Sequence, residues 1–336
     1  MEFRPDPPTP NAFGARVLEA AKANGFEISG IVDLDLARAA YATHLNAYDV
    51  WLERGYQGTM EYLRRGRDRR ADPTLLLPQA KSVLVVADPY TKQPQGELDP
   101  TRGPRFARYL KGRDYHGRLA ERLEALATAV RAELTDSDLL RHKDCVDTSA
   151  VLERAWGAIV GLGWIGKNTL LIHPTEGSYF FTGAILWNRA SDMPPDPLPD
   201  WCGKCERCLK GCPTQALVQP RVLDANQCIS YWTLEERGVP SRLSPSEKKL
   251  QGLWVAGCDV CQEVCPFNQK PAARELRTDP DPLLVSDWVA LQAETEAEYR
   301  ARVKNTALAR VKGPEFRRNL EIALDNFLNR DNPPPV

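Results

Sequence analysis

Four cysteines and a proline occur in WCGKCERCLKGCP at positions 201–213, and this run constrains the fold more than any other feature of the chain. Its spacing, C-x2-C-x2-C-x3-C-P, is that of bacterial two-cluster ferredoxins, in which the first three thiolates hold one iron–sulfur cluster and the fourth holds the other. Thiolates three residues apart on a tight loop converge on one cuboidal cluster, whereas the residue before the proline has already turned away. The run therefore predicts a loop-rich segment that holds two clusters.

A second run, GCDVCQEVCP at 257–266, supplies three more cysteines before a proline, one short of the full pattern. Cys228, in DANQCISY, is the candidate for the missing ligand. The crossed arrangement of ferredoxins then predicts two 4Fe-4S clusters. The expected ligands are Cys202, Cys205, Cys208 and Cys265 for one cluster, and Cys212, Cys228, Cys258 and Cys261 for the other.

Structural zinc is the alternative interpretation, since separated C-x2-C pairs also build four-thiolate zinc sites. We favour iron because zinc loops need neither three cysteines at successive three-residue steps nor the Cys-Pro ending. Disulfides are disfavoured because MEFRPDPPTPN lacks the apolar core of a secretory signal, and no stretch of about 18 apolar residues occurs. We expect a cytoplasmic protein with reduced thiols, in which Cys145 is an ordinary buried side chain.

Hydrophobic periodicity predicts a mixed α/β chain ahead of the cysteines. Helical spacing predicts helices at 11–24, 35–53 and 114–134, and short apolar runs predict strands at 27–32 and 82–87. The last run, SVLVVA, is continuously apolar, as is typical of a strand covered on both faces. Four prolines in the ten residues 191–200 indicate a stiff linker and hence a domain boundary. The pattern over 283–327 is helical.

The segment at 161–167, GLGWIGK, matches the glycine pattern of dinucleotide-binding loops, but its context excludes that function. The pattern binds pyrophosphate only where a strand enters the glycines and a helix leaves them. Here a helix is predicted before them at 151–160, and two strands after them, at 168–173 and 178–187, around a turn at Glu176-Gly177. We expect the glycines to allow close backbone approach to something flat or large.

Asp147 lies between a predicted strand and the helix at 151–160. Its position fits an N-cap, since aspartate side chains accept hydrogen bonds from the first turn of a helix. It equally fits a proton donor beside the glycine segment, a role that needs an environment which raises the carboxyl pKa toward neutrality.

Six motifs in order resemble the epoxyqueuosine reductase family, and the resemblance covers nearly the whole chain. They are RYLKGRDYH at 108–116, Asp147-Thr148 with VLER, GLGWIGKNTLLI, CGKCxxCxxxCP, CISYWT and GCDVCQxVCPFN. The resemblance implies an N-terminal cobalamin-binding α/β domain (1–190) akin to reductive dehalogenases. A ferredoxin-like domain with two 4Fe-4S clusters (191–270) and a short helical C-terminal region (271–336) would follow.

The resemblance also implies an oxidoreductase that uses cobalamin to reduce the epoxide of epoxyqueuosine at the wobble base of tRNA. Asp147 would be the proton donor. Cobalamin contacts would fall at Arg70, Tyr109, Asp147, Lys167 and Ser230. The implied partners are tRNA and a low-potential electron donor, with no membrane association and a monomeric chain. In Asp147-Thr-Ser-Ala-Val the chain lacks the proline that the family more often has close behind the aspartate.

Two other functions share part of this evidence: a corrinoid iron–sulfur dehalogenase acting on a small organohalide, and a non-catalytic electron-transfer ferredoxin. Corrin binding separates the second from the rest. The net charge of −1 means that any tRNA contact uses local basic patches. Candidate patches are Arg64, Arg65, Arg67, Arg69 and Arg70, and the group Arg102, Arg105, Arg108, Lys111 and Arg113.

Overall fold

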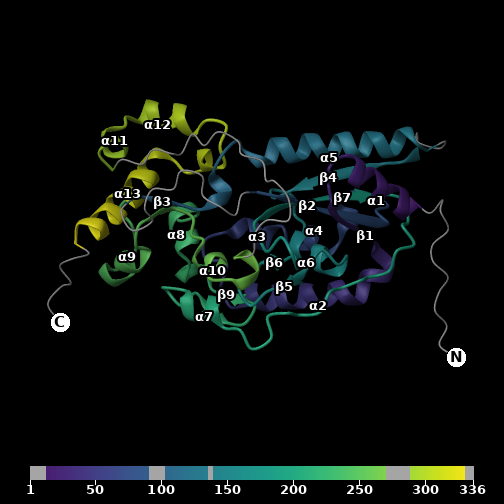
Figure 1. Cartoon of the computed structure of the whole chain (residues 1–336), viewed down its shortest axis with the longest axis horizontal. Coiled ribbons are helices and arrows are strands. Elements are labelled where there is room, and N and C mark those ends of the chain that lie inside the picture. Colours follow the sequence, from purple (N-terminus) through teal and green to yellow (C-terminus); the bar gives the residue numbers. More distant parts are fainter. Residues whose placement is uncertain (1–12, 91–102, 135–138, 270–287, 330–336) are drawn as a thin grey trace.

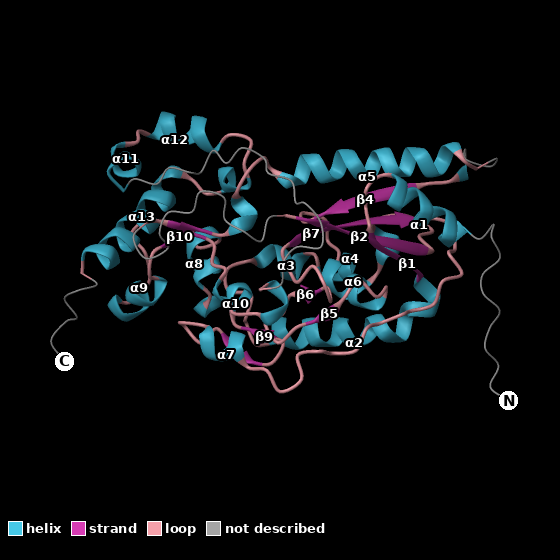
Figure 2. Cartoon of the chain, viewed as in Figure 1, coloured by secondary structure: helices cyan, strands magenta, loops and turns pink. Residues whose placement is uncertain are grey.

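A four-stranded antiparallel sheet lies at the centre of the N-terminal half (Figures 1 and 2). The computed structural model describes residues 13–90, 103–134, 139–269 and 288–329. The strand order is β1 (Ile28–Asp33), β2 (Ser82–Pro89), β7 (Phe180–Trp187) and β4 (His142–Val146). Residues 82–88 of β2 are all buried, which confirms the prediction of a strand covered on both faces.

Helices cover both faces of this sheet. Leu84 and Val86 of β2 pack against α1 (Phe13–Ala23) and α5 (Tyr115–Ala132). The alternate residues Val83 and Val85 pack against α2 (Leu34–Glu53) and α6 (Glu153–Ile159). Because successive side chains of a strand point to opposite faces of the sheet, β2 contributes to both hydrophobic layers. The predicted helices and strands ahead of the cysteines are confirmed, with the start of the first helix, residues 11 and 12, outside the described residues.

Both strands predicted around Glu176-Gly177 are present, but they do not pair with each other as a ladder. β6 (Leu171–Ile172) pairs with β5 (Trp164–Ile165), whereas β7 joins the central sheet, so only an isolated bridge from His173 to Gly177 links the two segments. The glycines lie close to the chain's own backbone, and their approach to a flat or large ligand stays a prediction. A Cβ on Gly163 would lie 2.2 Å from the Ile172 carbonyl oxygen, and one on Gly161 2.5 Å from that of Asp196. They allow close approach of the chain's own backbone.

Short elements separated by loops make up the cysteine-rich segment. They are α7 (Arg207–Gly211), β8 (Leu217–Gln219), β9 (Val222–Leu223), α8 (Ile229–Leu234), α9 (Pro245–Gln251), β10 (Trp254–Ala256) and α10 (Val260–Glu263). The proline-rich stretch before them has no regular structure and lies along the sheet domain. There the Asp33 amide donates to the Met193 carbonyl (2.9 Å) and the Asp196 amide to that of Ile159 (3.0 Å).

The C-terminal helices α11 (Trp288–Ala293), α12 (Glu296–Val303) and α13 (Gly313–Leu328) confirm the helical pattern, with residues 283–287 outside the described part. Phe316 and Leu320 of α13 share one hydrophobic cluster with Val255 and with Leu119 of α5. The three predicted segments are therefore packed together, and their division into domains stays a prediction. Within the described residues, no helix has the length and apolar character needed to cross a membrane.

Candidate active site

The eight cysteines expected as ligands lie in two sets of four. Burial raises the pKa of the Cys265 thiol, and the nearby thiols of Cys202 and Cys205 raise it further. Burial also raises the pKa of the Cys208 thiol, and the nearby thiols of Cys202 and Cys265 add to the rise. In the other set, burial raises the pKa of Cys261, and the thiols that add to this rise are Cys258, Cys228 and Cys212. These neighbourhoods match the two crossed sets that the spacing predicts.

The thiols of each set do not have the close spacing of a zinc site. Among the described residues, which include all eight cysteines, no three thiols lie within 4.8 Å of one another. Four sulfurs bound to one zinc ion at 2.3 Å would be only about 3.8 Å apart. A donor set of thiols at wider spacing fits the larger cuboidal cluster, in which each thiolate binds a different iron.

Neighbouring groups hold the cluster loops in place. The Trp164 indole donates to Cys202 Sγ (3.4 Å). Lys167 Nζ donates to the carbonyl oxygens of Gly203 (2.8 Å) and Cys205 (2.9 Å). Lys167, expected to contact cobalamin, thus lies against the first cluster loop. The backbone N–H of Ser230, also expected there, points to Cys228 and partly offsets the pKa rise that burial causes.

Asp147 lines a cavity of about 310 Å³ at the end of β4. The other lining residues are mostly aromatic: Tyr90, Tyr109, Tyr115, Phe180 and Phe181, with Glu153, Arg154 and Thr182. The Tyr115 and Phe181 rings stack at 4.0 Å between centroids, and Tyr90 lies 4.6 Å from Phe181. The cavity is at the small end of ligand pockets (~300–1,000 Å³), and flat aromatic walls suit a planar ring.

Asp147 is not an N-cap. Leu152 occupies the position that precedes α6, and Asp147 has a left-handed φ of 45°. That conformation costs a non-glycine residue roughly 1–3 kcal/mol and is found mainly at functional sites. It aims the carboxylate at His116 of α5, whose Nε2 lies 3.0 Å from Asp147 Oδ2. His116 Nδ1 in turn lies 2.6 Å from Asp114 Oδ1.

This arrangement places the shared proton on His116. The hydrogen bond with Asp147 raises the pKa of His116, and the hydrogen bond from His116 lowers the pKa of Asp147 despite burial. The direction is opposite to the one expected for a proton-donating aspartate. His116 was present in the RYLKGRDYH motif, but nothing in the spacing showed that it would meet Asp147.

We expect this ion pair to make stability depend on pH. A raised His116 pKa stabilises the fold fully below the unfolded value of about 6.5, and the contribution is lost as pH rises through the folded pKa. A lowered Asp147 pKa contributes above about 3.9 and is lost as pH falls through its folded value. Thermal unfolding of His116→Gln should therefore show a larger deficit near pH 6 than near pH 9, worth about 1 kcal/mol at most because Asp147 is half-exposed. A deficit independent of pH would contradict the pairing.

Two buried polar atoms near Asp147 have no hydrogen-bond partner in the described part of the chain: Glu153 Oε1 and Arg70 Nη1. Burial raises the pKa of Glu153 to about 7. Arg70 is held by the Tyr41 hydroxyl, which donates to its carbonyl, and its charge reaches Glu153. Such unpaired atoms are rare inside proteins and fit a site that a polar cofactor or substrate completes. Arg70 and Tyr109 thus lie on the Asp147 side of the molecule.

Two functional candidates were missed in the sequence. Arg310, just before α13, pairs with Glu235 at the end of α8, and its charge affects Tyr109 and Asp147. The two residues are 75 positions apart and belong to no motif, so no spacing rule could have joined them.

Several candidate phosphate-binding residues instead form ion pairs or hydrogen bonds within the protein. Arg105 pairs with Glu263 (2.6 Å) and Arg108 with the Tyr179 hydroxyl (2.6 Å), while Arg67 pairs with Asp49 (2.6 Å). Arg70 is buried. Of the two proposed patches, Arg64, Arg65, Arg69 and Arg113 are exposed, and Arg102 lies outside the described residues.

Comparisons with known proteins give consistent matches. The 4Fe-4S double cluster binding domain matches residues 201–268, and the family described as epoxyqueuosine reductase QueG, DUF1730, matches residues 70–148. An epoxyqueuosine reductase of Prochlorococcus marinus (strain NATL2A) is 34% identical over 91% of this chain and 95% of its own length. One from Synechocystis sp. is 39% identical over 82% and 93%. A crystal structure of epoxyqueuosine reductase with an epoxyqueuosine-modified tRNA-Tyr stem loop has a TM-score of 0.79 at 28% identity, covering 93% of this chain and 80% of that one.

Proposed function

Since the chain belongs to the epoxyqueuosine reductase family, we propose that it reduces the epoxide of epoxyqueuosine in tRNA to the alkene of queuosine. The observation that carries this proposal is the Asp147–His116 pair at the wall of an aromatic cavity, on a chain that also presents two sets of four thiols. Epoxide reduction to an alkene consumes two electrons and two protons and releases water. The site must therefore deliver both the electrons and the protons.

The cysteine sets would hold the two 4Fe-4S clusters, with Cys202, Cys205, Cys208 and Cys265 on one and Cys212, Cys228, Cys258 and Cys261 on the other. The second set would be the one nearer the cavity, since the charge of Cys261 acts on Tyr179 and the Tyr179 ring lies 5.8 Å from that of the cavity residue Tyr90. Clusters transfer one electron at a time. Electrons would enter at the first set and leave from the second.

Cobalamin is the cofactor that fits beside the cavity, where Arg70 Nη1 and Glu153 Oε1 have no partner among the described residues. When bound, it would supply a strongly reducing, two-electron centre for the epoxide carbon. Arg70, Tyr109 and Asp147 would contact it from the cavity side. Lys167 and Ser230 would act at the cluster loops, with their carbonyl and thiol contacts fixing the loops nearest to it.

Protons would come from the Asp147–His116 pair. Asp147 would present its carboxylate to the substrate, and His116, which is hydrogen-bonded to it, would hold the proton that replaces the one given up. Binding of the nucleoside would exclude water from the half-exposed Asp147 carboxylate, and burial favours its protonated form. The proton would then move from His116 to Asp147 and on to the epoxide oxygen as the C–O bond breaks.

A direct test is turnover on a stem loop that carries epoxyqueuosine, with the full chain, cobalamin and a chemical reductant under anaerobic conditions. Mass spectrometry of the digested nucleosides should show loss of one oxygen atom from epoxyqueuosine. Unchanged nucleoside together with reduction of an added aryl halide would instead favour a dehalogenase.

The exposed arginines of α3 (Glu61–Arg65) and α4 (Arg67–Ala71) would bind tRNA phosphates. We expect Arg65→Gln with Arg69→Gln to weaken binding and to lower the salt slope by about 0.7 for each phosphate that the protein no longer neutralises. Lys22→Gln, at the exposed end of α1 on the opposite face of the sheet, is the matched control. An unchanged slope, measured by titration at several salt concentrations, would assign these arginines to a solvated surface.

The low-potential electron donor would dock at the groove next to the first cluster loop. This groove, of about 540 Å³, is lined by Lys204, Arg207 and Lys210 together with Glu206, Glu263, Val264 and Gln269. The three positive charges outnumber the two carboxylates, one of which pairs with Lys210 (3.0 Å), and suit an acidic donor protein. Lys204→Glu with Lys210→Glu should slow turnover driven by reduced ferredoxin and leave turnover driven by dithionite unchanged. Equal rates with ferredoxin would contradict docking at this groove.

A further inference from the structure

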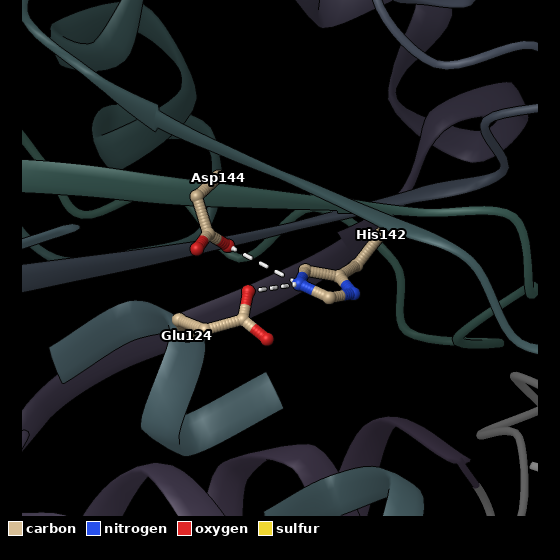
Figure 3. A group of neighbouring side chains, drawn as sticks. All are labelled: Glu124, His142 and Asp144. Atoms are coloured by element: carbon tan, nitrogen blue, oxygen red, sulfur yellow. Dashed lines mark hydrogen bonds and ion pairs between the residues drawn. The ribbon is translucent and has the colours of Figure 1, made fainter. Parts of the chain in front are cut away.

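Three side chains with metal-binding atoms meet on the α5 face of β4, outside the cavity (Figure 3). His142 and Asp144 are alternate residues of this edge strand, so both point toward α5, which carries Glu124. Their ligand atoms all lie within 4.8 Å of one another. Within the described residues, this is the one group of three or more histidine, cysteine or carboxylate ligands at such spacing.

Both carboxylates face the same imidazole nitrogen. His142 Nε2 lies 2.9 Å from Glu124 Oε2 and 3.8 Å from Asp144 Oδ1. A single N–H can point at only one acceptor, and Glu124 is the nearer. Asp144 Oδ1 is buried and has no hydrogen-bond partner in the described part of the chain. A proton on the imidazole nitrogen can bridge to only one of the two carboxylate oxygens. A metal ion placed between the three atoms can bind the nitrogen and both oxygens.

Surrounding residues position the side chains of Glu124 and His142. Arg131 binds the other Glu124 oxygen, Oε1 (3.0 Å), so that Oε2 remains directed at His142. The His142 ring lies 5.5 Å from the Trp187 ring, which holds it over the strand. The His142 and Asp144 side chains are only 10% and 18% exposed, whereas Glu124 is 55% exposed, so an ion would enter from the helix side.

We propose that Glu124, His142 and Asp144 bind one divalent transition-metal ion of the zinc class. One imidazole nitrogen and two carboxylate oxygens are ligands for zinc, manganese or iron(II), whereas magnesium and calcium prefer oxygen alone. Two carboxylates against one arginine leave a local negative charge that a dication neutralises. The same two elements, α5 and β4, carry His116 and lead into Asp147. The ion would therefore fasten the helix to the strand about 12 Å along α5 from the proton-donating pair.

Calorimetric titration of zinc chloride tests the site, with the full chain carrying both iron–sulfur clusters so that the cysteines are occupied. Wild-type protein should take up one zinc ion, and Glu124→Gln and His142→Gln should bind it at least about tenfold more weakly. Glu121→Gln, one turn earlier on α5 and exposed, is the matched control and should bind like wild type. Zinc should also raise the unfolding temperature of wild type but not of Glu124→Gln.

Glu124 is exposed, so its variant tests the site even if His142→Gln fails to fold. Equal zinc affinity in wild type and Glu124→Gln would overturn the proposal. Magnesium binding as tight as zinc would overturn the assignment to the zinc class, because the imidazole would then contribute nothing.

Discussion

Asp147→Asn is expected to lower epoxide reduction by about 100- to 10,000-fold, the range for loss of a general acid, while both clusters and cobalamin stay bound. Asparagine keeps the size of the side chain and can still accept a hydrogen bond from His116, so the cavity should be unchanged. The measurement is single-turnover conversion of the epoxyqueuosine stem loop, with cofactor content read from the visible spectrum.

The variant Glu153→Gln tests whether Glu153, rather than Asp147, is the proton donor. Glu153 lines the same cavity, and its pKa of about 7 leaves much of it protonated at neutral pH. We expect Glu153→Gln to retain most of the chemical step, because glutamine keeps the size of the side chain and can still form hydrogen bonds from this wall of the cavity. Normal turnover in Asp147→Asn with loss in Glu153→Gln would identify Glu153 as the donor.

Cys261→Ala should remove the second cluster and with it all turnover. Cys261 is partly buried and lies near three other thiols, and an incomplete cysteine set cannot hold a 4Fe-4S cluster stably. Iron analysis should fall by about half, with the first cluster still visible by electron paramagnetic resonance after reduction.

Cys145→Ala is the matched control for that experiment. Cys145 is the ninth cysteine, and it is fully buried in the hydrophobic layer between the sheet and α6. Its removal should cost some stability but no iron and no activity. Loss of iron from Cys145→Ala as large as that from Cys261→Ala would contradict the assignment of ligands.

Patterns that depend on local spacing were predictable. The cysteine spacing, together with the crossed arrangement of ferredoxins, predicted two sets of four thiols, and the same residues are neighbours in the fold. The strand at 82–87 was predicted because an unbroken apolar run needs cover on both faces, and β2 has it.

Features that depend on tertiary contacts were not predictable. The position of Lys167 against Gly203 and Cys205, and the internal pairing of Arg105 and Arg108, depend on packing between distant segments. The pKa direction of Asp147 was missed for the same reason. Burial alone would raise it, but His116, 31 residues earlier, is close enough to reverse the shift.

The measurement that tests the central claim most directly is metal analysis of the anaerobically purified chain together with its visible spectrum. Two clusters held by the two cysteine sets predict about eight iron atoms per chain, a similar amount of acid-labile sulfide and a brown colour that bleaches on reduction. A colourless protein that holds two zinc ions per chain at the cysteines would contradict the account, because no electrons could then reach the cavity.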